Sequence, residues 1–246
     1  MKMAKIILAA MLAGSLAGPA MADATNVVLV HGATMDGSGW RAVYDILRAR
    51  GLKVSVVQLP HTSLVDDIDA TRLVLRQQQG STVLVGHSYG GAVITEAGSE
   101  ANVKALVYVA ALQPDGGETL SELSKRYPMK IDMKMMGNNR FVPDPASYHD
   151  TIAADLPRSL TDFMSASSTP MPVAVFEANF GHAAWRDKPS FAIVATEDKV
   201  IPPDLARWMY QRSGAKTADI ASSHMVYMSH PEETAAVIVQ AIEAVK

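Results

Sequence analysis

The chain has 246 residues, of which 48% are hydrophobic and 19% are charged, and its formal net charge is −3 at pH 7. This composition is typical of one globular domain with a substantial core, and it offers no basic surface for nucleic acid. Cysteine is absent, which excludes disulfides, thiolate catalysis and Cys-ligated metals; His and carboxylate metal sites remain open, but no H-E-x-x-H motif occurs.

The first 22 residues have the pattern of a secretory signal peptide. Lys2 and Lys5 precede an apolar stretch over residues 6–17, and residues 20–22 (Ala-Met-Ala) are typical of a cleavage site. We therefore predict export to a bacterial periplasm or to the medium, with no stable membrane anchor after cleavage and a mature domain at 23–246. An uncleaved N-terminal membrane anchor is the alternative.

Strand and helix patterns alternate through most of the chain. Apolar, β-branched runs predict buried strands, and amphipathic stretches between them predict helices, the first capped by Ser38 and ended by Gly51. This alternation predicts an α/β domain with a mostly parallel six-stranded sheet and helices on both faces. The expected strands are 26–30, 53–57, 82–85, 103–110, 190–195 and 216–220, and the expected helices are 40–50, 66–79, 92–97, 203–214 and one from 231 to the end.

The alternation of strand and helix patterns stops between about residues 119 and 186. This stretch has no continuous apolar strand, contains several prolines and shows only short helical patterns. We predict a helical lid inserted after the fourth strand, because long insertions in compact domains are usually functional. Its methionines either line an adaptable apolar substrate pocket or fill the lid's own core. They are Met129, Met133, Met135, Met136, Met164 and Met171.

A G-x-S-x-G motif lies between the third strand and the helix that follows it. In Gly86-His87-Ser88-Tyr89-Gly90 the serine is expected in a strained turn, where a Cβ at either flanking glycine would collide with the neighbouring strand or helix. Such a turn exposes a nucleophilic Oγ beside the N–H groups of a helix start. The alternative is a glycine-rich turn with an incidental serine.

A serine hydroxyl needs a base, and the base needs a carboxylate to orient it. Asp198 and His224 each follow a later strand, so they can meet Ser88 at the carboxyl edge of a parallel sheet, in the chain order Ser…Asp…His. His230 competes with His224 for the role of base, and Asp115 competes with Asp198 for that of acid. An ion pair with Lys199 is the non-catalytic alternative for Asp198.

Two backbone N–H groups are expected to stabilise an oxyanion. The loop His31-Gly32-Ala33 follows the first strand, which should lie next to the strand that ends at Ser88. The N–H groups of Ala33 and Tyr89 can then converge on one oxygen. His31 is expected to pack between loops, and Trp40 to lie in the core.

Four motifs in this order resemble an α/β-hydrolase-fold protein: Val-His-Gly-Ala, Gly-His-Ser-Tyr-Gly-Gly, Asp-Lys-Val-Ile-Pro-Pro and Ser-Ser-His-Met. The likeness spans residues 25–246 and is greatest to the compact group of carboxylesterases, plant methyl esterases and hydroxynitrile lyases. It implies a catalytic triad of Ser88, Asp198 and His224, with Ala33 and Tyr89 in the oxyanion hole.

Two positions depart from the lyases of this group. The lyases carry a lysine directly after the catalytic histidine and a threonine in the first loop, where this chain has Met225 and Gly32. Both differences argue against lyase chemistry, and Ser88 excludes the aspartate nucleophile of the dehalogenases.

We expect an exported serine hydrolase that cleaves small to medium apolar carboxylic esters through an acyl-enzyme. Its partner would be a small-molecule ester, and we expect neither a cofactor nor a metal. The alternatives are an amide or lactone hydrolase or acyltransferase using the same triad, and a catalytically silent protein that binds a small ligand.

Overall fold

The centre of the molecule is a six-stranded sheet in which every neighbouring pair is parallel, in the order β2-β1-β3-β4-β8-β9. The predicted sheet is confirmed, with strand ends within two residues of those expected. The central strands are buried along their whole length or nearly so, while the edge strands are more exposed, as expected for a parallel sheet covered on both faces. The strands are β1 (Asn26–Val30), β2 (Lys53–Val56), β3 (Thr82–His87), β4 (Val103–Val109), β8 (Ser190–Ala195) and β9 (Lys216–Ile220).

This computed structural model describes residues 26–246. The predicted signal peptide at residues 1–22 lies outside the described residues, so its cleavage and the export of the chain stay predictions. Across residues 26–246, none of the helices combines the length and the apolar character needed to cross a membrane.

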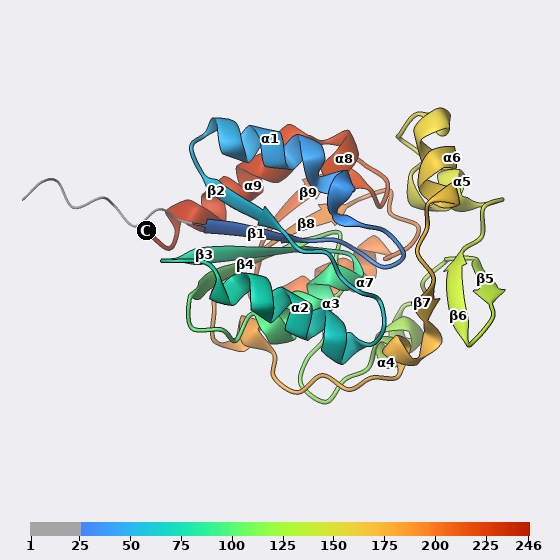
Figure 1. The fold of residues 1–246 in the computed structure, drawn as a ribbon, viewed down its shortest axis with the longest axis horizontal. Helices are drawn as coiled ribbons and strands as arrows, with labels where there is room; N and C mark the ends of the chain where they lie inside the picture. Colours follow the sequence, from blue (N-terminus) through green and yellow to red (C-terminus); the bar gives the residue numbers. More distant parts are fainter. Residues whose placement is uncertain (1–25) are drawn as a thin grey trace, which may run out of the picture.

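Helices cover both faces of the sheet (Figure 1). In that view α1 and α9 pack together on the upper face, and α2 and α3 pack together below. The predicted cap at Ser38 is wrong: Asp36 caps a short 3-10 turn, Gly37–Trp40, and Ser38 lies inside that turn with its N–H donating to the Asp36 side chain. The helices are α1 (Arg41–Ala49), α2 (Leu64–Arg76), α3 (Tyr89–Ala97), α7 (Pro203–Arg212), α8 (Val226–Ser229) and α9 (Pro231–Glu243).

The winding direction of the sheet changes between β1 and β3. The chain runs from β1 outward to β2, then crosses back to place β3 on the other side of β1, with Val28 opposite Leu84. Loops that leave such a switch point diverge and open a crevice at the carboxyl ends of the strands. The loop after β1 and the turn after β3 therefore flank that crevice, which is where ligands bind in open parallel sheets.

The inserted segment, residues 119–186, is only partly helical. It contains helices α4–α6, and it also carries an antiparallel sheet in the order β5-β6-β7, which corrects the prediction of a helical insertion. These strands have two to four residues, too few to show an alternating pattern. The sequence nevertheless carried a signal for a hairpin, the pair Asn138-Asn139, because asparagine tolerates the positive φ that tight hairpin turns need. Both residues adopt positive φ between β5 and β6. The elements are α4 (Leu120–Arg126), β5 (Met133–Met136), β6 (Arg140–Pro143), α5 (Tyr148–Ile152), α6 (Arg158–Ala166) and β7 (Met171–Pro172).

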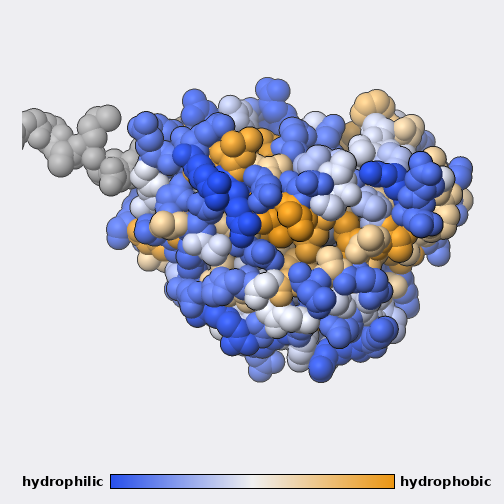
Figure 2. Space-filling view, turned by 60° about the horizontal axis from the view of Figure 1, so that its bottom comes forward, coloured by the Kyte–Doolittle hydropathy of each residue, from blue (hydrophilic) through white to orange (hydrophobic). Residues whose placement is uncertain are grey.

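The surface of the inserted segment is partly apolar. Figure 2 shows an apolar band that runs from the middle of the visible face toward the end of the molecule that carries this segment. Within the segment, the large exposed apolar side chains come from β5 and α6. They are Met133, Met135, Met136, Leu160 and Phe163.

Two glycines hold the turn after β3 in close contact with its surroundings. A Cβ on Gly86 would lie 2.5 Å from the carbonyl oxygen of Gly90, and a Cβ on Gly90 would lie 2.5 Å from the carbonyl oxygen of His31. Both contacts are with backbone, which cannot move aside as a flexible side chain would. The predicted reason for the two motif glycines is therefore confirmed.

We expect Gly90→Ala to lower the free energy of unfolding by at least about 2 kcal/mol, because the new methyl group overpacks a site walled by the backbone of the β1 loop. Urea unfolding measures the change. Gly137→Ala is the matched control, since nothing lies within 4 Å of a Cβ built on Gly137. Equal stability of Gly90→Ala and the control would contradict this account of the turn.

Candidate active site

Ser88 occupies a strained turn between β3 and α3. Its φ of 53° and ψ of −124° lie outside the regions that residues with a side chain normally adopt. Strain of this kind persists only where the surroundings hold it, and here the N–H of Ser88 donates to Val109 while its carbonyl accepts from Gly91 and Leu112. The turn leaves Ser88 half-buried at the end of a rigid strand.

The structure brings Ser88 together with the two residues predicted to activate it. Ser88 Oγ lies 2.8 Å from His224 Nε2, and His224 Nδ1 lies 2.7 Å from Asp198 Oδ2. Because an ionised carboxylate only accepts, Nδ1 carries the hydrogen and Nε2 is left to accept the serine proton. The His224 and Asp198 side chains are 4% and 2% exposed, so water does not compete for the hydrogen bond between them.

Other hydrogen bonds fix this arrangement and remove the competing candidates. Asp198 Oδ1 accepts the N–H groups of Val200 and Ile201, and Lys199 donates to the carbonyl of Asp150 and does not pair with Asp198. His230 lies at the surface beside Glu233. Asp115 is also excluded, because its carboxylate pairs with Arg186.

The two predicted oxyanion donors also lie beside the serine. Tyr89 is the first residue of α3, where a backbone N–H has no acceptor in its own helix, and the N–H of Ala33 donates to no other described residue. Ala33, Ser88 and Tyr89 line the same cavity. The phenol of Tyr89 donates to the buried carboxylate of Asp67, 2.8 Å away, so the hydroxyl of Tyr89 already has a partner.

The cavity beside Ser88 is almost wholly apolar. We call it the Met171 cavity; its volume is about 60 Å³, and its wall joins the loops of the main sheet to the inserted segment. Met129, Met133 and Met171 line it, which favours the pocket interpretation for three of the methionines, whereas Met135 and Met136 are exposed. Among residues 26–246 no cluster of His, Asp and Glu is arranged to hold a metal ion.

The model of the alpha/beta hydrolase family matches residues 27–237. The chain belongs to this family. A pyrethroid hydrolase of Sphingobium wenxiniae is 28% identical over 89% of this chain and 88% of its own. A carbendazim hydrolyzing esterase of Nocardioides is 29% identical over 62% of this chain and 71% of its own. The solved structure of a pyrethroid hydrolase from Sphingobium faniae superposes with a TM-score of 0.77 at 23% identity, covering 89% and 98% of the two chains, and shows the shared fold.

Two residues of this alpha/beta hydrolase that were not predicted to take part support His224. The ring of His87 packs against that of His224 with 4.7 Å between centroids, and its Nε2 donates to the His224 carbonyl over 3.0 Å. Burial, with repulsion from His224, lowers the pKa of His87 well below its usual value, so this ring stays neutral and acts as a hydrogen-bond donor.

Asp155, in the inserted segment, holds the loop that carries His224. Its carboxylate accepts the hydroxyls of Ser222 and Ser223 and the N–H of Ser223, directly before His224. Burial opposes ionisation of Asp155, but the hydrogen bonds from Ser223 and Ser222 outweigh it and keep the pKa of Asp155 below its usual value. No sequence motif marks this residue.

We expect Asp155→Ala to lower kcat about 10- to 100-fold with a smaller change in KM, because the His224 loop loses its anchor while no substrate contact is removed. It should also lower the free energy of unfolding by about 2 kcal/mol. Ester-hydrolysis kinetics and urea unfolding check both. Asp150→Ala, which removes an exposed carboxylate of the same segment, is the control. A variant with wild-type kcat would show that Asp155 does not position the loop.

We expect His61 to make the stability of this alpha/beta hydrolase sensitive to acid. Burial, together with repulsion from His31, lowers the pKa of His61 to about 4, and Arg140 donates to its carbonyl. The unfolded chain binds this proton near pH 6.5 and the native state does not, so stability falls as the pH drops through that window. Between pH 7 and pH 5 we expect this group to remove about 2 kcal/mol from the free energy of unfolding.

Urea unfolding at the two pH values measures that loss. His61→Asn is the comparison, because asparagine tolerates the φ of 53° at this position and does not titrate. The variant should lose about 2 kcal/mol less than the wild type between pH 7 and pH 5. An identical loss in both proteins would contradict the assignment to His61.

Proposed function

We propose that the protein is a serine hydrolase that cleaves carboxylic esters with apolar acid and alcohol parts. The hydrogen-bonded chain from Ser88 Oγ through His224 to Asp198 carries this proposal, because it is the arrangement that turns a serine hydroxyl into a nucleophile. Two similar proteins, an esterase and a pyrethroid hydrolase, support hydrolysis.

The geometry supports a two-step reaction. Ser88 Oγ attacks the ester carbonyl carbon as its proton passes to His224 Nε2, and the N–H groups of Ala33 and Tyr89 hold the oxyanion. The bond to the alcohol oxygen then breaks, and His224 returns its proton to that oxygen. Water next attacks the acyl-enzyme, giving one proton to His224, which restores it to Ser88 as the acid leaves.

The environment of Ser88 favours a neutral, apolar substrate. Apart from Ser88 and Tyr89, whose hydroxyl is paired with Asp67, the residues that line the Met171 cavity are apolar, and no Lys, Arg, Asp or Glu lines it. A charged ligand would lose its hydration there without gaining a partner. The residue after His224 is the buried Met225, which supplies no ammonium group for lyase chemistry.

The test is turnover of matched substrates by the purified protein: an ester, the corresponding amide and a lactone of similar size, each with and without an added alcohol as acyl acceptor. We expect hydrolysis of the ester to dominate, with one acid released per alcohol. Preferred cleavage of the amide or lactone, or transfer of the acyl group to the added alcohol, would replace ester hydrolysis with that reaction. Stoichiometric ligand binding without turnover, and no labelling of Ser88 by a fluorophosphonate, would overturn the enzyme assignment altogether.

A further inference from the structure

Ser88 lies between two small cavities. Besides the Met171 cavity there is a second one of about 40 Å³, which we call the Ile152 cavity. Tyr148, Ile152 and His224 line only this second cavity of the two, whereas Ala33, Ser88 and Phe141 line both. The nucleophile therefore faces space on two sides.

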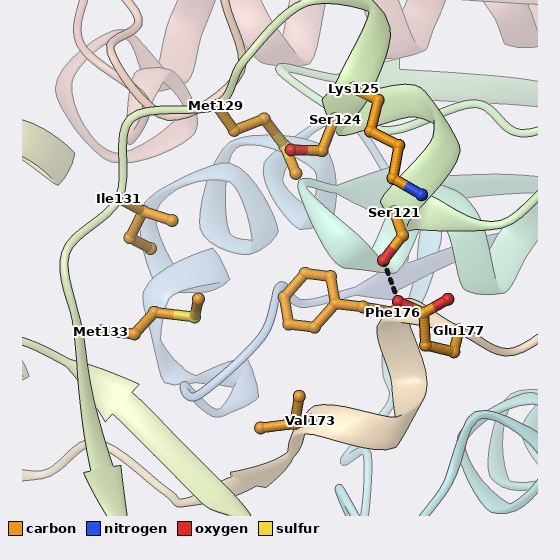
Figure 3. A pocket seen from close by; sticks show the side chains of 9 residues that line it. All are labelled: Ser121, Ser124, Lys125, Met129, Ile131, Met133, Val173, Phe176 and Glu177. Carbon is orange, nitrogen blue, oxygen red and sulfur yellow. Dashed lines mark hydrogen bonds between the residues drawn. The ribbon is translucent and has the colours of Figure 1, made fainter.

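Each cavity shares a wall with a wider pocket at the surface. Met129, Met133 and Phe176 line both the Met171 cavity and a pocket of about 370 Å³ beside Lys125, which we call the Lys125 pocket. Figure 3 shows the ring of Phe176 pointing across this pocket toward Ile131 and Met133.

On the other side, Met35 and Tyr148 line both the Ile152 cavity and a pocket of about 430 Å³ beside Phe163, which we call the Phe163 pocket. The two surface pockets have no lining residue in common. Ile131 lines the Lys125 pocket and both small cavities, whereas the Phe163 pocket shares lining residues with the Ile152 cavity and none with the Met171 cavity. Of the two surface pockets, the Met171 cavity therefore adjoins the Lys125 pocket alone, and Ser88 lies between this side and the side of the Phe163 pocket.

We propose that these four spaces form one passage with two mouths, in which the acyl chain of the ester extends toward the Lys125 pocket and the alcohol toward the Phe163 pocket. This orientation rests on the proposed ester hydrolysis. The departing alcohol oxygen must receive its proton from His224, and His224 lines the Ile152 cavity but not the Met171 cavity. The alcohol therefore starts on the Ile152 side, and the acyl group takes the other side.

The walls between the cavities and their mouths are side chains that can move. Methionine has three rotatable bonds and adapts its shape to what it contacts, so Met133 and Met35 can turn aside without moving the backbone. Met133 is 44% exposed, and Met35 is half-buried at the edge of the core, where the Tyr227 hydroxyl lies 3.5 Å from its sulfur. A long chain on either side of the ester can then continue into the surface pocket, and acid and alcohol have separate exits.

The test uses two series of esters, one lengthened only in the acid and one only in the alcohol. Met133→Trp narrows the mouth at the Lys125 pocket, and Met35→Trp narrows the mouth at the Phe163 pocket. Met136→Trp is the control, because Met136 lies on the same strand and lines none of the four spaces. Met133→Ala and Met35→Ala widen the same mouths, so the passage can still be tested if a tryptophan variant does not fold.

We expect Met133→Trp to lower kcat/KM about tenfold or more for long acids relative to short ones while leaving the alcohol series unchanged, and Met35→Trp to do the reverse. The alanine variants should favour the longer chains of the same series. The proposed passage would be wrong if both tryptophan variants affected the same ester series, or if each affected the opposite series. It would also be wrong if neither effect depended on chain length.

Failure of the proposed function would look different, since the wild type would then turn over no ester of either series. The passage is then tested by the rate at which phosphonates inactivate Ser88, with a long chain placed either on phosphorus or on the leaving oxygen. The same crossed pattern between Met133→Trp and Met35→Trp supports the passage, and its absence overturns it.

Discussion

Replacement of Ser88 by alanine is expected to lower kcat for ester hydrolysis by a factor on the order of 10⁴ to 10⁶, because no other group near the cavity can form the acyl-enzyme. Ser88 Oγ is the atom that His224 Nε2 contacts at 2.8 Å, and the rest of the site contributes binding and oxyanion stabilisation without a nucleophile. Initial rates with a chromogenic ester measure the loss, and urea unfolding shows whether the fold is intact.

The matched control is Ser99→Ala, which removes an exposed hydroxyl just beyond α3 and should leave kcat unchanged. Triad members act as a unit, so adding His224→Ala to Ser88→Ala should cause little further loss. Comparable activity in wild type and Ser88→Ala would show that the hydrolysis does not use this serine, and an additive loss in the double variant would show that the two residues work separately.

The main sheet and the relative positions of Ser88, Asp198 and His224 were predictable because they depend on strong, short-range patterns. The central strands are covered on both faces, so each appears as a continuous apolar run, and the carboxyl ends of parallel strands must share one edge. The glycines at 86 and 90 made the turn predictable, because the close backbone contacts observed there are possible only without Cβ atoms at these two positions.

The features that escaped prediction depend on contacts between distant segments or on very short elements. Asp155 is separated from Ser223 by 68 positions, and its role exists only once the inserted segment folds over the His224 loop. The small sheet β5-β6-β7 has too few residues per strand for periodicity, and only the pair Asn138-Asn139 indicated its hairpin. Ser38 failed as a cap because Asp36 begins a tighter turn two residues earlier.

Replacement of Asp198 by asparagine is the second large effect, with kcat expected to fall on the order of 10⁴-fold at nearly unchanged size and shape. Asp198 Oδ1 accepts two backbone N–H groups, from Val200 at 2.7 Å and Ile201 at 3.0 Å. An asparagine must keep its oxygen there, since the opposite rotamer would set its NH₂ group against both donors. Its NH₂ group then faces His224 Nδ1 in place of the carboxylate oxygen.

That exchange reverses the polarity of the whole chain of hydrogen bonds. Nδ1 of His224 has to accept, so the ring hydrogen moves to Nε2, and Nε2 donates to Ser88 when it should receive the serine proton. KM should change little, because Asp198 lines neither small cavity as a substrate contact would.

The control is Glu197→Gln, which neutralises a neighbouring exposed carboxylate. In a His224→Ala background, Asp198→Asn should cause little further loss of kcat, because the imidazole that Asp198 orients is gone. A loss in kcat of less than about tenfold would show that Asp198 does not set the tautomer of His224.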